Sequence, residues 1–184
     1  KERGQLEARY LVDVVSSASV DVVTAATGRF LDIRHEITAG GGYGDGTNSI
    51  AASYIHSREN DWWSHTVNVG GSRDFLQHNL TLGLGGSIVL NDVGRSHDAN
   101  FHRSMNVYGA GLSAGYTASR RDLLSLSYSF AYISGYQASP YRYVIYVDES
   151  GFRASEPEHV PETRQRHALV LRWNGHCLKN SALQ

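Results

Sequence analysis

Apolar and polar residues alternate along most of this 184-residue chain, and this period of two limits its fold more than any other feature. In the clearest segment, 124–132, Leu or an aromatic residue stands at every even position and Ser or Ala at every odd position. Successive side chains of a β-strand point to opposite faces, so such a segment has one apolar and one polar face. The pattern predicts an all-β protein.

The same alternation recurs at intervals, with β-branched segments near the start of the chain. Glycine and tyrosine are abundant, at 19 and 11 residues, while Lys1 and Lys179 are the only lysines. This composition suits strands and tight turns. We expect about 8–10 antiparallel strands in a single domain spanning 1–184. The predicted strands are 6–15, 20–25, 29–40, 48–57, 62–69, 80–88, 108–116, 124–132 and 168–173.

The length and the polar faces of these strands indicate a membrane. Several run to about ten residues, the length that crosses a bilayer at a tilt. Their polar faces carry Ser, Gly, Thr and Asn where a water-facing sheet would usually carry more charge. Small polar side chains suit the interior of a barrel. The expected architecture is an antiparallel up-and-down transmembrane β-barrel, or part of one. A soluble β-sandwich or barrel that binds a partner through its loops is the alternative.

Two sets of side chains are the candidate functional residues. Asp32, Arg34 and Glu36 share one face of one predicted strand, where they would tune solute passage or simply pair as an ion ladder. Arg172 is a further possible lumen charge. Aromatic residues near strand ends predict the two girdles of a membrane barrel. The candidate girdle residues are Trp62, Trp63, Tyr116, Tyr132, Tyr136 and Trp173.

The predicted connections alternate only partly between long and short. Segments 91–104 and 136–165 are expected to be long loops, and 119–122 a tight turn. Outer-membrane barrels have short turns on the periplasmic side and longer loops outside. The turns at 44–46 and 59–61 are both predicted to be short, so the first half does not follow this rule.

Several stretches together resemble an uncharacterised family of Gram-negative outer-membrane β-barrel proteins. They are YLVDVVSSASVDVVTAAT at 10–27, LSLSYSF at 124–130 followed by SGYQASPYR at 134–142, and RQRHAL at 164–169. The resemblance covers about Arg9 to Arg172 and implies a porin-like membrane protein of the bacterial outer membrane, without a catalytic assignment. In that family we would expect more strands after 164–169. Here 175–179 breaks the alternation, so we expect a portion of a longer protein. Its partners would be the lipid bilayer and further strands or other subunits.

The sequence predicts no catalytic, cofactor or metal site. One cysteine, Cys177, excludes an internal disulfide and a Cys-based zinc site. The net charge of −1 gives no reason to expect a nucleic-acid partner. His97 and His102 lie near Asp92 and Asp98, but their spacing matches no closed zinc pattern and favours a solvated loop.

Enzymatic activity is not predicted either. The neighbours His56 and Ser57 raise a third possibility, a barrel-wall hydrolase, but no G-x-S-x-G turn occurs. His35 and His65 interrupt apolar faces, where packing is expected rather than metal ligation. We therefore expect an outer-membrane scaffold or passive channel without chemistry of its own.

Overall fold

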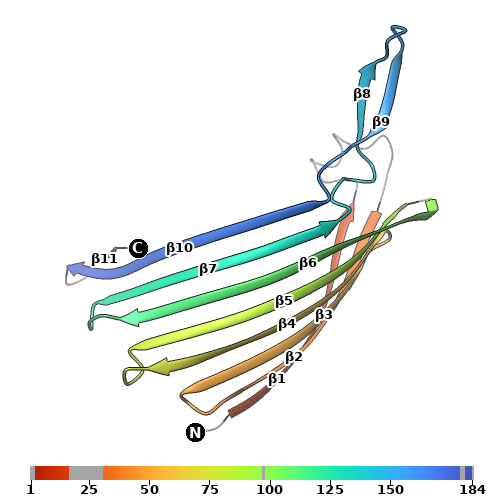
Figure 1. The fold of residues 1–184 in the computed structure, drawn as a ribbon. Helices are drawn as coiled ribbons and strands as arrows, with labels where there is room; N and C mark the ends of the chain where they lie inside the picture. The colour runs from red at the N-terminus through yellow and green to blue at the C-terminus, as the bar shows by residue number, and fades with distance from the viewer. Residues whose placement is uncertain (1–2, 17–30, 97, 179–180, 184) are drawn as a thin grey trace.

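The chain folds into one large antiparallel sheet and a separate hairpin (Figure 1). The computed structural model describes residues 3–16, 31–96, 98–178 and 181–183. Within these ranges the regular elements are all strands, which confirms the all-β prediction. None of the described residues forms a helix long and apolar enough to cross a membrane. The strands are β1 (Arg3–Ser16), β2 (Leu31–Gly44), β3 (Asn48–Arg58), β4 (Trp62–Phe75), β5 (Leu80–Arg95), β6 (Asp98–Thr117), β7 (Asp122–Gly135), β8 (Tyr143–Val147), β9 (Arg153–Pro157), β10 (Thr163–Leu178) and β11 (Ser181–Leu183).

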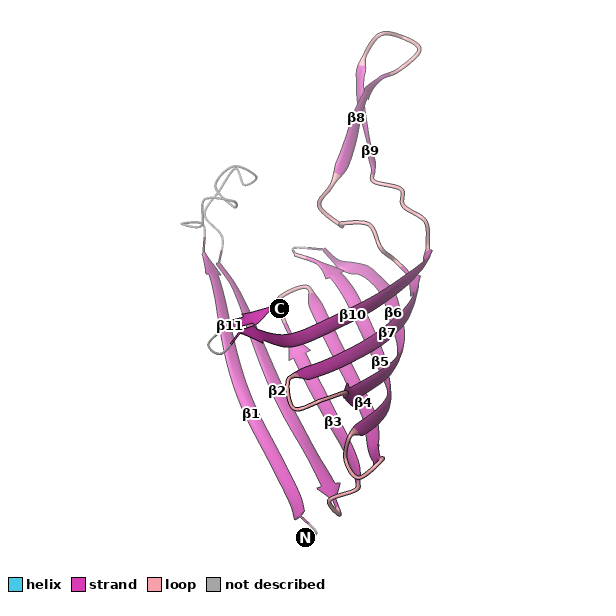
Figure 2. Cartoon of the chain, turned by 90° about the vertical axis from the view of Figure 1, so that its left-hand side faces the viewer, coloured by secondary structure: helices cyan, strands magenta, loops and turns pink. Residues whose placement is uncertain are grey.

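The main sheet has up-and-down topology. Its order is β1-β2-β3-β4-β5-β6-β7-β10-β11, with every neighbouring pair antiparallel. The hairpin β8–β9 projects beyond the sheet from the β7–β10 connection (Figure 1). The sheet curls strongly, but among the described residues its two margins, β1 and β10–β11, do not pair (Figure 2). The structure is therefore a curved open sheet.

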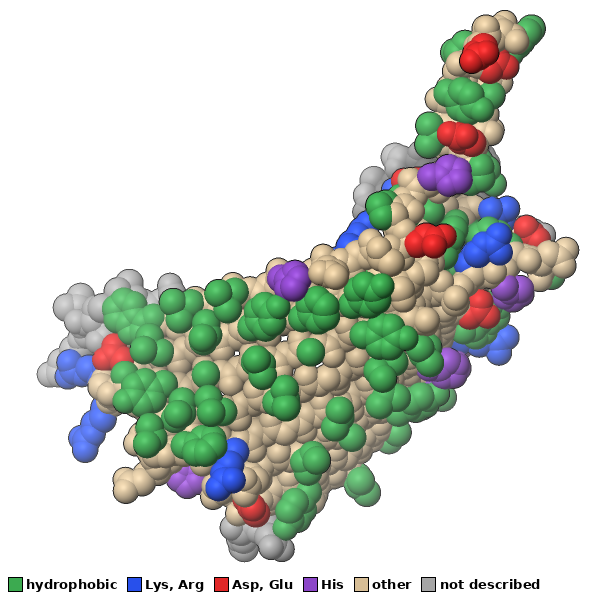
Figure 3. Space-filling model, viewed as in Figure 1, with side chains coloured by type: hydrophobic (Ala, Val, Ile, Leu, Met, Phe, Trp, Pro, Cys, Tyr) green, Lys and Arg blue, Asp and Glu red, His purple; other side chains and the backbone are tan. Residues whose placement is uncertain are grey.

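The register gives the sheet two chemically different faces. We call the side that carries Ser87, Gly109 and Ala131, which are cross-strand neighbours, the inner face. The buried residues other than glycine all lie on this side of the described sheet: Thr38, Asn91, Val93 and Ile133. On the outer face large apolar side chains are exposed, and they spread over the visible sheet in Figure 3. They include Leu84, Leu112, Leu169 and Leu171 at 65%, 56%, 70% and 75% exposure.

Small residues on the inner face permit the curl. A Cβ built on Gly83 would lie 2.4 Å from Ser113 Oγ, and one on Gly109 would lie 2.4 Å from Ser87 Oγ. Each glycine is the direct cross-strand neighbour of that serine. Because the concave side of a curved sheet has less room per residue, glycine opposite serine fits where two larger side chains would collide.

The two ends of the sheet differ in their connections. The turns 45–47, 76–79 and 118–121 lie together at what we call the short-turn end, where the Asp74 N–H donates to Thr47 and the Thr117 N–H to Asn79. The connections 59–61 and 136–162, together with Ser96, lie at the opposite, long-connection end. The predicted turns at 44–46, 59–61 and 119–122 are confirmed.

Three sequence predictions about strand limits are wrong. Residues 91–104 are not a long loop: β5 and β6 continue through them, with Asn91 opposite Met105 and Arg95 opposite Asp98. Segment 136–165 contains the hairpin β8–β9, and β10 runs past Gly175 to Leu178. A ladder is made by backbone groups, so polar or irregular side chains do not end it. The strand predicted at 20–25 lies outside the described residues.

Candidate functional site

The predicted charges of β2 lie on the inner face, and two of them, Arg34 and Glu36, form ion pairs with β1. Asp32, Arg34 and Glu36 share that face with Arg9 and Asp13 of β1. Arg9 Nη2 lies 2.9 Å from Glu36 Oε1, and Arg34 Nη2 lies 3.4 Å from Asp13 Oδ2. The geometry therefore matches the ion-ladder interpretation, in which the charges of the two strands compensate each other.

A group of three carboxylates adjoins this ladder at the long-connection end. Oxygens of Asp32, Glu59 and Asp61 lie within 4.8 Å of one another, close enough to approach one cation. They already have protein partners, however: Asn60 Nδ2 donates to Asp32 at 3.2 Å, and Arg34 Nε lies 3.9 Å from Glu59. Burial and the neighbouring Asp32 carboxylate raise the pKa of Glu59, and Arg34 opposes this effect.

Tyr141 connects the long β7–β8 segment to this acidic group. Its hydroxyl donates to the Asp61 carboxylate and accepts from the Ser96 N–H at 2.7 Å. Burial and the bond to Asp61 raise the pKa of Tyr141. The contact joins three connections at the long-connection end. This role was not predicted from the sequence, where the signal for it was weak: Tyr141 belongs to the 134–142 motif.

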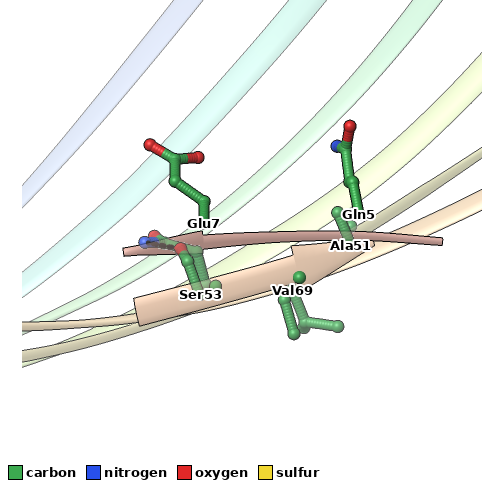
Figure 4. A pocket seen from close by; sticks show the side chains of 10 residues that line it. Gln5, Glu7, Ala51, Ser53 and Val69 are labelled. Carbon is green, nitrogen blue, oxygen red and sulfur yellow. Dashed lines mark hydrogen bonds between the residues drawn. The ribbon is translucent and has the colours of Figure 1, made fainter. Parts of the chain in front are cut away.

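Arg172 lies on the inner face of β10, together with Arg164 and Arg166. None of these arginines forms an ion pair with an acid in the described part of the chain. At the other margin Glu7 lies beside an inner-face hollow of ≈ 390 Å³. Figure 4 shows Gln5 and Glu7 pointing to one side of the sheet and Val69 to the other. The two margins therefore differ in inner-face charge: β10 carries three arginines, whereas β1 carries two acids, Glu7 and Asp13, and two arginines, Arg3 and Arg9.

Most of the predicted aromatic residues lie at the ends of the outer face. Trp63 and Tyr132 are outward near the long-connection end, and Tyr136 follows β7 there. Tyr116 and Trp173 are outward near the short-turn end, where Trp173 Nε1 donates to Asp122 at 3.0 Å.

Trp62 is the exception among the candidate girdle residues. It lies on the inner face opposite Val93, and its Nε1 donates to Asn91 Oδ1 at 3.1 Å. It is therefore part of the small buried cluster at the long-connection end and does not belong to an outward girdle. The physical reason is that adjacent residues of one strand face opposite sides, so Trp62 and Trp63 cannot both point outward.

Histidines on the outer face form a repeated contact that was not predicted from the sequence. The hydroxyls of Tyr10, Tyr54 and Tyr128 lie 2.6–2.7 Å from Nδ1 of a histidine on the next strand. In each pair the histidine stands two residues from the tyrosine's direct neighbour. These histidines are His35, His65 and His167.

The other polar residues considered from the sequence, the His56–Ser57 pair and the histidines and aspartates of segment 91–104, do not form a common site among the described residues. His56 lies on the outer face and Ser57 on the inner face, because they are consecutive in β3. His102 Nδ1 lies 3.5 Å from Asp92, whereas Asp98 contacts Arg95, and His97 lies outside the described residues.

Comparison of the chain with models of protein families, with curated proteins and with solved structures finds no match. The geometry of the sheet is therefore the basis on which a function is proposed.

Proposed function

We propose that this chain forms a wall of a β-barrel in the bacterial outer membrane, where it serves as a scaffold or passive channel. The observation that carries the proposal is the apolar outer face. Leu84, Leu169 and Leu171 are 65–75% exposed within long strands. In water such a surface would associate or aggregate, whereas hydrocarbon would cover it at no cost.

The rest of the geometry supports the same environment. The inner face carries Ser, Gly, Thr and paired charges, as the interior of a membrane barrel does. Outward aromatic residues lie near both ends of the strands, at the levels expected for the two headgroup regions. The long connection 136–162 lies at one end, and the opposite end, where the turns 45–47, 76–79 and 118–121 are all short, would be the periplasmic side.

An open sheet edge in lipid would leave backbone groups without partners, at a cost of several kcal/mol each. The proposal therefore requires that the β1 and β10–β11 margins pair, either with each other or with further strands or subunits.

The test compares arginine at two adjacent positions of β7, Leu126 on the outer face and Ser127 on the inner face. An arginine that faces lipid costs about 2–4 kcal/mol at the midplane and less toward the interfaces, whereas one inside the barrel does not meet hydrocarbon. We expect Leu126→Arg to reduce insertion of the full-length protein into phosphatidylcholine vesicles, and Ser127→Arg to insert like the unmodified protein.

Equal insertion of both variants, or a natural protein that stays in the aqueous fraction without detergent, would refute the membrane assignment. Conductance in a planar bilayer then separates the two roles: stepwise current supports a channel, and its absence leaves a scaffold.

A further inference from the structure

Five outward residues at the long-connection end of β2–β4 form a compact group, which we call the basic-aromatic patch: His35, His56, Arg58, Trp63 and His65. The register places His35, Arg58 and Trp63 side by side on three strands, and His56 directly opposite His65. The His56 and His65 ring centroids are 4.6 Å apart, and Arg58 Cζ lies 5.8 Å from the Trp63 ring centroid. We propose that this patch binds the phosphorylated headgroup of an anionic membrane lipid. The inference rests on the proposed function.

The charges of this region favour an anion. The outer face of β1–β4, within the described residues, carries arginine and histidine but no Asp or Glu. Its acids, such as Glu7, Asp13 and Asp74, all point to the inner face. The nearest outward acid, Asp92 opposite Trp63 on β5, has His102 at 3.5 Å. An anion at the patch would therefore meet hydrogen-bond donors, and the one outward carboxylate nearby, Asp92, already has His102 as its partner.

Tyrosine hydroxyls contact Nδ1 of two of the imidazoles of the patch. Tyr10 and Tyr54 hydroxyls lie 2.7 Å and 2.6 Å from Nδ1 of His35 and His65. When a tyrosine hydroxyl donates to Nδ1, the imidazole proton resides on Nε2, which is then a donor for another acceptor. Both imidazoles are exposed. The guanidinium of Arg58, stacked on an indole, keeps its edge N–H groups for a phosphate, the anion that Arg binds best.

The position of the patch favours a lipid over a free phosphate ion. On the side toward the sheet centre the neighbouring outward residues are Ile37, Val67 and Val69, at 50–54% exposure. Acyl chains would cover these residues while the headgroup contacts the patch. Trp and Arg at the edge of an apolar band are the side chains that occupy the headgroup level.

The opposite end of the same face offers a matched control. Arg73 also stacks on an aromatic ring, with its Cζ 5.4 Å from the Phe75 ring centroid. Its direct register neighbours are Asn48 and Leu82, so it has no imidazole beside it. Arg73 can therefore attract an anion by its charge, but it does not offer the several neighbouring hydrogen-bond donors of the patch.

The experiment measures retention of phosphatidic acid by the detergent-purified full-length protein, using native mass spectrometry. We expect Arg58→Gln to weaken retention about fivefold, the effect of one basic side chain at an anionic surface. Arg58→Lys should keep most of it, His65→Gln should lose part, and Arg73→Gln should bind like the unmodified protein. Insertion of each variant into pure phosphatidylcholine vesicles, measured in parallel, reports the fold and the membrane assignment.

Three results would overturn the inference. The first is unchanged retention of phosphatidic acid in Arg58→Gln, and the second is an equal loss of retention in Arg73→Gln. The third is displacement of the lipid by inorganic phosphate at the same concentration as the lipid, because this would indicate a site for the free ion. If the unmodified protein fails to insert into phosphatidylcholine, the proposed function fails, and this inference fails with it. If insertion succeeds and phosphatidic acid is not retained, only the lipid site is refuted.

Discussion

Asn91 and Asn106 provide a test of which way the sheet faces. They lie on neighbouring strands, β5 and β6, yet the register places Asn91 opposite Met105 on the inner face and Asn106 opposite Leu90 on the outer face. Asn91 is 7% exposed. Its Oδ1 accepts from Trp62 Nε1 at 3.1 Å, and its Nδ2 donates to the Met105 carbonyl at 2.9 Å. Replacing each asparagine by leucine therefore makes the same chemical change in two different environments.

At Asn91 the change removes two hydrogen bonds, each worth about 1 kcal/mol, and leaves a shielded carbonyl without its donor at a cost of about 1–3 kcal/mol. Leucine has as many side-chain heavy atoms as asparagine and branches at the same carbon, so no large cavity forms, and its added apolar burial returns about 1.5 kcal/mol. We expect a net destabilisation of about 1.5–3.5 kcal/mol. At Asn106 leucine would join the apolar outer face, so Asn106→Leu should be neutral or stabilising.

Urea unfolding of the vesicle-inserted protein, followed by tryptophan fluorescence, gives both free energies. Trp62 contacts Asn91, so its emission also reports the local change. Equal effects of the two substitutions, or a stabilising Asn91→Leu, would refute the assignment of inner and outer faces, because a slip by one residue exchanges the faces of every side chain.

Three further substitutions test local features of the fold by the same unfolding assay. Gly135 has φ +97°, and a Cβ there would lie 2.2 Å from the Ser104 carbonyl oxygen. Gly135→Ala should therefore lower the free energy of unfolding by at least about 1–3 kcal/mol, and a neutral result would contradict this backbone geometry. Hydrogen bonds from Asn48 and Thr47 lower the pKa of Asp45 from 3.8 to about 2 in the β2–β3 turn. Its stabilising effect is therefore present above pH 3.8 and lost as the pH falls toward 2, and Asp45→Asn should remove this part of the pH dependence; an unchanged profile would contradict it. Burial and Asp32 raise the pKa of Glu59, so its charged form opposes folding, and the stability present at low pH declines as the pH rises through the raised value. Glu59→Gln should therefore stabilise the protein at neutral pH, and a loss of stability there would show that the Arg34 contact outweighs burial.

Alternation predicted the strands well where they are regular, and failed where polar side chains continue along a paired backbone. The predicted strands at 48–57 and 124–132 lie within β3 and β7. The extension of β5 and β6 through 91–104 was not predictable, because Asp92, Ser104 and their neighbours have the composition of a loop. Only the pairing of the two backbones keeps them extended.

For the candidate site, the sequence predicted on which side of the sheet each residue lies, but it did not predict which residues contact one another. Placing Asp32, Arg34 and Glu36 on one polar face needed only their spacing. Their partners Arg9, Asp13 and Glu59 come from other strands or turns, and the Tyr141–Asp61 bond joins residues far apart in the chain. The aromatic residues followed the same rule: their spacing along each strand assigns a face, and Trp62 had to lie opposite Trp63.

The sequence by itself determined the class of structure and the chemistry of its two faces, because the direction of successive side chains along a strand is a local property of the backbone. The tertiary structure alone decided which strands are neighbours and in which register. These choices depend on hydrogen bonds between distant segments, and they created the ion ladder of β1–β2 and the outward patch of histidine, arginine and tryptophan on β2–β4.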